Sequence, residues 1–388
     1  MRARFAVSIG GRIGSALLQA GIFALLARAL GLDGFGVFSL ALAMSGFSLS
    51  LLDLGMGNRV LRGLRDNREK GALATYSILR AVLAAVLPVT AAIVAGSLEE
   101  PVWIAACAAA YAIGESTGDV AVGIRQGRKS SVTAMTILLV RRAATIAPLV
   151  LSNSEQAAAT AMLIAAVVGI TSYAAVAAAN LARPVSLNRL MRENLSLIAS
   201  GGATNLSQLD TAIVASSLGT AGAGYYGAGM RLFNPINLGI NTLLQVLIPE
   251  LASAPSQSQR KQHFLRARKL VLLASIVTVG ASAFAPALVT FLYGPEFSGA
   301  APIAIAVFVS AAISGLAQLH MSWFYAIGVP RIVPIGMWAS VALGLSLIWL
   351  LSQNAGISGA AIGFVAMHLL LAVSIIAPCE VAIRKIDG

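Results

Sequence analysis

Long apolar runs follow one another along the whole chain, and only short polar breaks separate them. The runs do not alternate between polar and apolar positions, so they predict helices rather than strands. A helix needs about 20 mostly apolar residues to cross the hydrocarbon core of a membrane. The pattern predicts twelve membrane-spanning helices, over residues 13–30, 34–56, 73–97, 102–124, 132–151, 157–180, 195–217, 225–248, 270–292, 302–326, 332–352 and 358–380.

Composition supports a protein that is embedded in lipid. The chain is 58% hydrophobic and only 11% charged, which leaves too little charge to cover the surface of a soluble domain. Backbone groups in lipid must be paired within the spanning structure, so the runs have to be helical. The predicted class is an all-α polytopic membrane protein.

One short motif occurs twice, half a chain apart. Leu-Gly-x-x-Gly-x-Gly-x-aromatic begins at Leu30 and again at Leu218, an offset of 219 − 31 = 188 residues between the first glycines. Six spans return the chain to its starting side, so the repeat predicts two six-helix lobes in the same orientation, residues 1–190 and 191–388. Similar segments later in the two halves have offsets near 200 residues rather than 188. The second half is therefore expected to contain additional residues, and we expect them in the basic loop 249–269.

The repeated glycines fit tight turns between helices, because glycine accepts a positive φ and a close approach of the backbone. A phosphate-binding loop is the alternative interpretation. No strand precedes these glycines and no Lys-Ser/Thr pair follows them, which argues against it. Cys107 and Cys379 fall in opposite halves of the membrane, and neither has neighbours suited to a metal, so no disulfide, metal or cofactor is expected.

Basic residues mark one side of the membrane. Of the 27 Lys and Arg residues, 22 lie in the termini and in every second loop, while the opposite loops hold only Arg28. The positive-inside rule then places both termini in the cytoplasm. The same rule explains the net charge of +12, so nucleic acid is not an expected partner. The first run has the flanks of a signal peptide, but its pattern recurs internally, and we interpret it as a retained helix.

Several segments resemble one known family. These are "LLARALGLDGFGVFSLALAMSGFSLSLLDLGMGNRVLR" (25–62), "GYYGAGMRLFNPINLGINTLLQVLIPELA" (224–252), "LYGPEFSGAAPIAIAVF" (292–308) and "YAIGVPRIVPIGMWASVALGLSLIWLLSQNAGISGAAIGFV" (325–365). They are similar to the polysaccharide flippases of the multidrug/oligosaccharidyl-lipid/polysaccharide exporter superfamily. Twelve spans depart from the lipid II flippases, which have two more.

The resemblance implies a MATE-like flippase in the bacterial inner membrane. It would move an undecaprenyl-pyrophosphate-linked oligosaccharide to the outer leaflet by alternating access, with the sugar in a cavity between the lobes. Membrane lipids, a polysaccharide polymerase and chain-length machinery are the implied partners. Coupling to protons or sodium is common in the superfamily.

Ionisable residues inside the predicted spans are costly and therefore informative. Glu115 and Asp119 are four residues apart and share one face of the fourth span. Glu115 lies 13 residues before Arg128 and Arg141 lies 13 residues after it, so a helical hairpin brings Glu115 to the depth of Arg141 and Arg142. This ion pair could be structural, or a carboxylate could take up a proton when the arginine turns to substrate.

Other polar residues in the spans are candidates for contact with substrate. We expect a pyrophosphate or acidic sugar at cationic groups and sugar hydroxyls at amides. The predicted substrate-binding residues are Arg231, Arg141, Arg142, Gln19, Asn205, Gln208 and Asn234, and the predicted ion-coupling residues are Glu115, Asp119 and Asp210. Arg231 could instead snorkel to the interface, and the amides and Asp210 could instead join helices by hydrogen bonds.

Three further ionisable residues are expected to have smaller roles. His320 occupies the repeat position of Asp119, at an offset of 201 residues, and packing explains it as well as titration does. Asp53 and Arg80 lie near the inner ends of their spans, where snorkelling or helix capping accounts for them.

Two rival functions remain at this point. A multidrug cation antiporter coupled to protons or sodium would have the same fold and would need an acidic cavity. A membrane enzyme, such as a polymerase or glycosyltransferase, would need catalytic residues on a large outer loop, and the pattern leaves no such loop. We therefore expect a transporter rather than an enzyme.

The parallel repeat predicts the sidedness of two positions. Tags at the N-terminus and near residue 190 should both be accessible from the cytoplasm, because six spans separate them. Labelling of single cysteines with a membrane-impermeant reagent, in intact and in opened cells, measures this. Labelling of the two positions from opposite sides would contradict the repeat.

Overall fold

The computed structural model describes residues 2–53, 56, 60, 64, 66–128, 130–233, 235–237, 256–327 and 329–384, with the backbone alone at 2–9, 193–201, 204 and 325–327. Every regular element in these ranges is helical, which confirms the predicted all-α class. The chain forms two compact units, Met1–Ala212 and Ile213–Gly388. The predicted lobe boundary at residue 190 stays a prediction.

Among the described residues, six helices with defined bounds and the start of a seventh lie in unit 1. They are α1 (Arg2–Leu51), α3 (Asn67–Ser97), α4 (Val102–Gly127), α5 (Ser131–Leu151), α6 (Glu155–Ala177), α7 (Leu187–Leu206) and the first residues of α8 (Asp210–Met230). Unit 2 contains the rest of α8, together with α10 (Gln257–Ala281), α11 (Ala285–Tyr293), α12 (Ala301–Ile327) and α13 (Ile332–Arg384). Short 3₁₀ turns cover Ala178–Asn180, Ser207–Leu209, Ser282–Phe284 and Pro295–Ala300.

Helix α1 is a hairpin of two arms rather than one straight rod. Gly31 has a non-helical backbone, with φ 66° and ψ −178°. The rings of Phe23 and Phe38, on either side of it, lie 6.1 Å apart, whereas 15 residues of straight helix would separate them by about 22 Å. The two arms therefore correspond to the first two predicted spans.

The repeated motif has the same geometry in both places. Gly219 has φ 72° and ψ −170°, close to the values at Gly31, and this region is accessible essentially to glycine alone. A second glycine follows the turning glycine by three residues in each copy. A Cβ at Gly34 would lie 3.2 Å from the Cβ of Leu30, and a Cβ at Gly222 would overlap the Cβ of Leu218. The second glycine in each copy thus makes room for the leucine of its own motif.

Helix α13 is also a hairpin, and glycines bring its arms together. It turns at Ala355 and Gly356, whose backbones are non-helical. A Cβ at Gly363 would meet the Cα of Ile348 at 2.7 Å. Small residues are the usual means of close helix packing in lipid, so the last two predicted spans pair directly.

Seven helices among the described residues are long and apolar enough to cross a membrane. They are Gly10–Leu51, Asn67–Ser97, Ser131–Leu151, Glu155–Asn180, Gln257–Tyr293, Pro295–Phe324 and Ile332–Arg384. The first and the last contain the hairpins at Gly31 and Gly356 and so cover two predicted spans each. Helix α4 matches the fourth predicted span in extent but carries Glu115 and Asp119, which lower its hydropathy. Half of the eighth predicted span, 234 and 238–248, lies outside the described residues.

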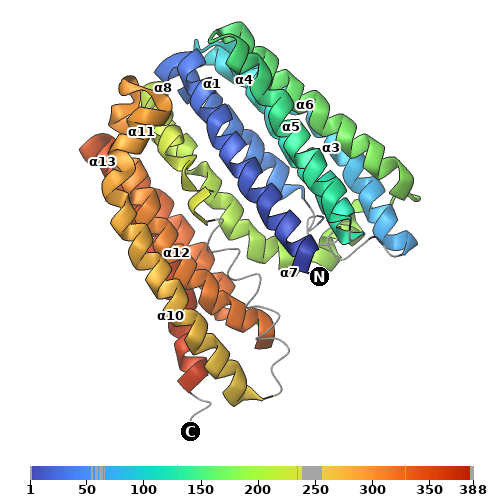
Figure 1. The fold of residues 1–388 in the computed structure, drawn as a ribbon, viewed down its shortest axis with the longest axis vertical. Helices are drawn as coiled ribbons and strands as arrows, with labels where there is room; N and C mark the ends of the chain where they lie inside the picture. Colours follow the sequence, from blue (N-terminus) through green and yellow to red (C-terminus); the bar gives the residue numbers. More distant parts are fainter. Residues whose placement is uncertain are drawn as a thin grey trace. The chain divides into compact units, whose positions relative to one another are not determined.

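One helix is central to each unit. In unit 1, α4 packs against α1, α3, α5 and α6, and in unit 2, α12 packs against α10, α11 and α13. Figure 1 shows α3, α4, α5 and α6 running alongside one another in unit 1, and α10 and α12 doing so in unit 2. A Cβ at Gly114 of α4 would lie 2.5 Å from the carbonyl oxygen of Ala165 in α6, so these two backbones are in contact.

The extra residues of the second half do not lie in the basic loop 249–269, so that expectation is wrong. Arg80 follows the buried Tyr76 by one turn of α3, and Arg268 follows the buried Phe264 by one turn of α10. The offset here is 268 − 80 = 188, the same as at the glycines. The additional length enters after Arg268, where a 3₁₀ turn, the short α11 and a second 3₁₀ turn precede α12.

The seventh predicted span is interrupted. Residues 195–217 were expected to form one helix, but Ser207–Leu209 form a 3₁₀ turn between α7 and α8. Polar residues cluster at this point, and their side chains compete for backbone hydrogen bonds and weaken an α-helix. Asn205 therefore lies in α7, Gln208 in the 3₁₀ turn and Asp210 at the start of α8.

Gly31 and Gly219 should tolerate alanine poorly. Gly31→Ala and Gly219→Ala should each cost about 1–3 kcal/mol, because their backbone conformation strains any side chain. Gly280→Ala is the matched control, since a Cβ there has nothing within 4 Å and its φ is not positive. Thermal unfolding in detergent measures the difference. Equal melting temperatures for all three variants would contradict the assignment of the turns.

Candidate functional site

Helix α4 presents Tyr111, Glu115 and Asp119 at intervals of four residues, so the three side chains share one face. Tyr111 is buried at 1% exposure, the Glu115 side chain is 15% exposed and that of Asp119 is 64% exposed. The face therefore runs from the interior of unit 1 to its surface.

Two consecutive arginines of α5 meet this face. Arg141 Nη2 donates to Asp119 Oδ1 at 2.7 Å and Nη1 donates to the backbone carbonyl of Glu115 at 3.2 Å. Glu115 contacts both arginines, with Oε1 at 3.4 Å from Arg141 Nε and Oε2 at 2.5 Å from Arg142 Nη1. The predicted pairing of Glu115 with Arg141 or Arg142 is confirmed.

Arg142 reaches two more groups in the interior. Its Nε donates to Ser15 Oγ of α1 at 3.4 Å, and its Nη1 donates to the hydroxyl of Tyr111 at 3.5 Å. Ser15 is 5% exposed. The guanidinium therefore links α1, α4 and α5.

A glycine makes the space for this arrangement. A Cβ at Gly118 would overlap Nη1 of Arg141, so the guanidinium occupies the volume that a side chain would fill. Gly118 lies between Glu115 and Asp119 on α4, and its lack of a side chain lets Arg141 approach both carboxylates.

The cluster, defined as Glu115, Asp119, Arg141 and Arg142, carries two positive and two negative charges. Both arginines are buried, at 0% and 4% exposure. A buried charge that loses its partner is strongly destabilising, so each arginine depends on a carboxylate or on an anion that replaces one. Asp119 is the exposed member, which makes it the side of the cluster open to exchange.

Asn205, Gln208 and Asp210 are not part of this cluster. Asn205 Nδ2 donates to the carbonyl oxygen of Ser50 in the second arm of α1 at 3.5 Å. Gln208 lies against Gly46 of the same arm, where a Cβ would lie 2.9 Å from its Oε1. Asp210 is buried at 5% exposure, and its Oδ1 accepts from the backbone N–H of Thr211 at 2.5 Å. The contacts of Asn205 and Gln208 are those of residues that join helices, whereas this contact of Asp210 lies within α8.

Arg231 lies at the end of α8 in unit 2. Its backbone N–H donates to the carbonyl oxygen of Gly227 at 3.1 Å, which continues the helical ladder by one turn. Its side chain lies within electrostatic reach of the buried Tyr293. Asn234 lies outside the described residues. Its neighbour Asn237 is 5% exposed, and Oδ1 of Asn237 has no hydrogen-bond partner in the described part of the chain.

Gln19 and Arg80 are placed in unit 1. Gln19 is half-buried and lies one turn beyond Ser15 on α1, on the same face. Arg80 does not snorkel, because its side chain is only 3% exposed. It donates to the carbonyl oxygen of Leu49 at 3.0 Å near the end of α1, lies 3.6 Å from Asp53 and covers the ring of Tyr76. The capping interpretation is therefore confirmed.

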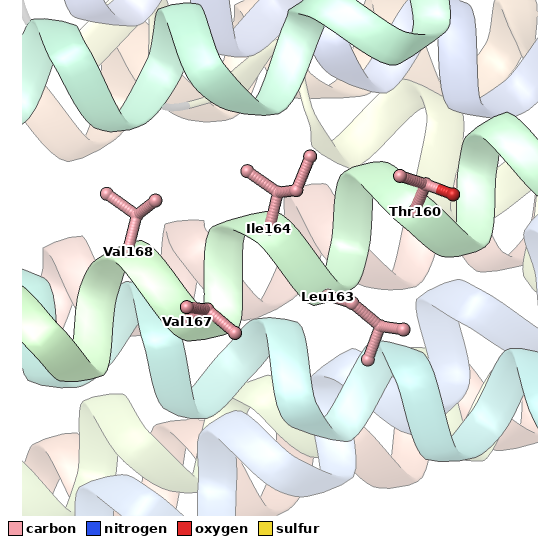
Figure 2. A pocket seen from close by; sticks show the side chains of 5 residues that line it. All are labelled: Thr160, Leu163, Ile164, Val167 and Val168. Atoms are coloured by element: carbon pink, nitrogen blue, oxygen red, sulfur yellow. The ribbon is translucent and has the colours of Figure 1, made fainter.

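A surface groove on α6 differs in character from the charged cluster. Thr160, Leu163, Ile164, Val167 and Val168 line it, and Figure 2 shows their side chains on successive turns of the helix. One hydroxyl among four aliphatic side chains does not fit a sugar. Leu163 and Val167 are exposed on this face, as expected of a surface that contacts acyl chains.

Three residues of the site were missed by sequence reasoning. Tyr111 could have been found, since it precedes Glu115 by four residues on the same face. Gly118 could have been noticed as the small residue between two carboxylates. Ser15 lies on a different helix, and nothing in its sequence context indicates contact with Arg142.

The two carboxylates should differ strongly in their effect on stability. Glu115→Gln leaves two buried arginines with too little negative charge and should destabilise unit 1 by about 3–5 kcal/mol. Asp119→Asn is the matched control and should cost at most about 1 kcal/mol, because Asp119 is mostly exposed. Thermal unfolding of the two variants in detergent measures this. A similar loss from both variants would contradict the central role of Glu115.

Solved structures with the same fold cover nearly the whole chain. A multidrug resistance MATE family transporter of the MOP superfamily in an inward-facing conformation is 15% identical, with a TM-score of 0.66 over 100% of this chain and 96% of that one. A MOP superfamily transporter from Pyrococcus furiosus is 17% identical, with a TM-score of 0.65 over 100% and 96%. The MATE multidrug transporter DinF-BH is 15% identical, with a TM-score of 0.65 over 99% and 94%. The MATE-like fold is thereby confirmed.

The sequence gives a more specific assignment than the fold does. A comparison with curated proteins finds no match. Residues 2–255, which make up more than half of the 388-residue chain, match the polysaccharide biosynthesis protein family. The chain therefore belongs to the polysaccharide biosynthesis protein family and is a multi-pass membrane protein with the fold of MATE transporters.

Proposed function

We propose that this protein moves a polyprenyl-pyrophosphate-linked oligosaccharide from the cytoplasmic to the outer leaflet of the bacterial inner membrane, by alternating access. Membership of the polysaccharide biosynthesis family supports the kind of cargo, and the MATE-like fold supports the transport mechanism. The observation that carries the proposal is the buried cluster of Arg141 and Arg142 with two carboxylates in unit 1.

The cluster suits an anionic head group that binds and leaves. A pyrophosphate oxygen can take the place of Asp119 at Arg141, since both are oxygen acceptors for the same guanidinium. Asp119 is exposed and can move aside without leaving a buried charge behind. A proton taken up by Asp119 or by Glu115 would then offset the negative charge that the pyrophosphate brings, which links substrate binding to proton uptake.

We propose further contacts with the cargo at amides of unit 1 and at an arginine of unit 2. Asn205, Gln208 and Gln19 are half-buried, and amide groups both donate to and accept from sugar hydroxyls. Arg231 is the third proposed cation, after Arg141 and Arg142, and lies within unit 2. Asn234 and Asp210 complete the proposed set, Asp210 as an ion-coupling group. Lipids and a polysaccharide polymerase are the proposed partners, and both termini are proposed to be cytoplasmic.

A multidrug cation antiporter is the second candidate function. The exposed carboxylate of Asp119 favours it, because a cationic drug or a sodium ion could bind there. In the MOP superfamily transporter from Pyrococcus furiosus, a reverse polarity of the binding pocket suggests a different function, so pocket polarity differs among proteins of this fold. Returning the gene to a deletion strain distinguishes the two functions. A flippase would restore surface polysaccharide, whereas an antiporter would restore drug resistance.

Arg231 provides a test at a single position. Arg231→Ala should abolish export of surface polysaccharide in a complemented deletion strain, because the cargo loses a cationic contact. Arg28→Ala, which removes an exposed arginine, is the matched control and should leave export intact. Immunoblotting of membranes establishes equal protein levels. Full export by Arg231→Ala at normal protein level would remove Arg231 from the proposed site.

A further inference from the structure

A second group of ionisable side chains lies within unit 2, on the central helix α12. His320 is 3% exposed. Its Nδ1 lies 2.7 Å from the backbone carbonyl oxygen of Leu316, and its Nε2 lies 3.2 Å from Glu380 Oε1 of α13. Arg268 Nη1 of α10 donates to the same carboxylate oxygen at 2.9 Å.

The hydrogen bonds of His320 determine where its protons must be. A carbonyl oxygen only accepts, so Nδ1 has to carry a proton. In the neutral ring Nε2 would then be an unprotonated acceptor, because only one nitrogen of a neutral imidazole carries hydrogen. An acceptor nitrogen and a carboxylate oxygen do not attract each other at 3.2 Å. The contact requires one more proton, on Nε2 or on the carboxyl group of Glu380.

The surroundings supply no other proton for this contact among the described residues. Arg268 already directs its donor at the same oxygen, and Phe264 packs edge-on against the His320 ring, with centroids 5.2 Å apart. Cys379 donates to the backbone carbonyl of His320, not to its ring. Helix α12 carries no Asp, Glu, Lys or Arg, α11 carries no charged residue, and Glu296 precedes the opposite end of α12. Other titratable residues of the neighbouring helices include Arg260, Lys261, His263, Arg266 and Lys269 of α10 and Arg384 of α13. Among the described residues, the ion pairs of Glu380 are those with Arg268 and His320.

We propose that His320 and Glu380 form a proton-binding site in unit 2. The site takes up one proton from a hydronium ion, which is left as a water molecule, and holds the proton between Nε2 and Oε1. When the proton leaves, the lone pair of Nε2 faces a carboxylate, and the two groups separate while Glu380 keeps Arg268. Proton binding thus adds a polar contact to the buried apolar cluster that packs α12 against α13 at this end of unit 2.

The repeat gives this site a counterpart. His320 stands at the position of Asp119, and Arg268 stands at the position of Arg80. Asp119 pairs with Arg141 of α5, whereas His320 pairs with Glu380 of α13. The central helix of each unit therefore presents a titratable side chain at an equivalent position, but only the unit 2 contact needs an added proton to exist.

The site can be tested without any transport assay, so its outcome is separate from that of the proposed function. The full-length protein, labelled with ¹⁵N histidine and placed in lipid bilayers, is examined by NMR, with His320→Gln used to assign the signal. Infrared spectroscopy of the same sample detects a protonated carboxyl group at Glu380, assigned by Glu380→Gln. The control variant Arg268→Gln keeps both partners of the proton.

We expect either two protonated nitrogens on His320 or a protonated Glu380 in the unmodified protein. Glu380→Gln should lose that one proton at the same pH, leaving Nδ1 alone protonated, and Arg268→Gln should retain it. If Glu380→Gln does not fold, the measurement on the unmodified protein still decides. A neutral His320 together with an ionised Glu380, at every pH at which the protein is folded, would overturn the proposal.

Discussion

Compensation of buried charge within unit 1 is the constraint on which its structure depends. In lipid an isolated arginine is costly, and here Arg80, Arg141 and Arg142 are almost fully buried. Each has an acceptor within its own unit: a carbonyl at the end of α1 for Arg80, and carboxylates of α4 for the other two. The helices that carry these groups are consequently tied together at fixed depths, and α4 and α5 can hardly slide past each other without breaking an ion pair.

Close packing of helices makes these contacts geometrically possible. Lipid offers helices little hydrophobic reason to associate, so contact depends on small residues that let backbones approach. The chain uses glycine in this way between α4 and α6 and between the arms of α13. The glycines at Gly31 and Gly219 have a different task, since their backbone conformation turns the chain. Both uses occur in both halves, which is what an internal duplication would leave.

The sequence was sufficient for the class, the repeat and one ion pair, because each depends on a regular period. Apolar runs predicted the helices, and the offset of 188 residues identified the two copies of the glycine motif. Because Glu115 and Arg141 are equally far from Arg128, the sequence also predicted their contact. It was not sufficient for the 3₁₀ turn at Ser207–Leu209, because a change from α-helical to 3₁₀ backbone hydrogen bonding over three residues leaves the apolar pattern unaltered. The contact of Ser15 with Arg142 depends on how α1 rotates about its axis, and the burial of Arg80 depends on where α1 ends. The sequence did not locate the extra residues correctly, because loop lengths alone do not align α3 with α10, whereas the buried residues Tyr76 and Phe264 do.

The space left by Gly118 makes a neutral residue part of the electrostatic design of α4. A methyl group at this position would add no charge and remove none, yet it would push the guanidinium of Arg141 away from the carboxylates that neutralise it. Surveys that substitute only charged residues would overlook such a position. Among relatives of this protein, the identity of the residue three places after the membrane-embedded glutamate should therefore reveal which of them can accommodate an arginine on the neighbouring helix.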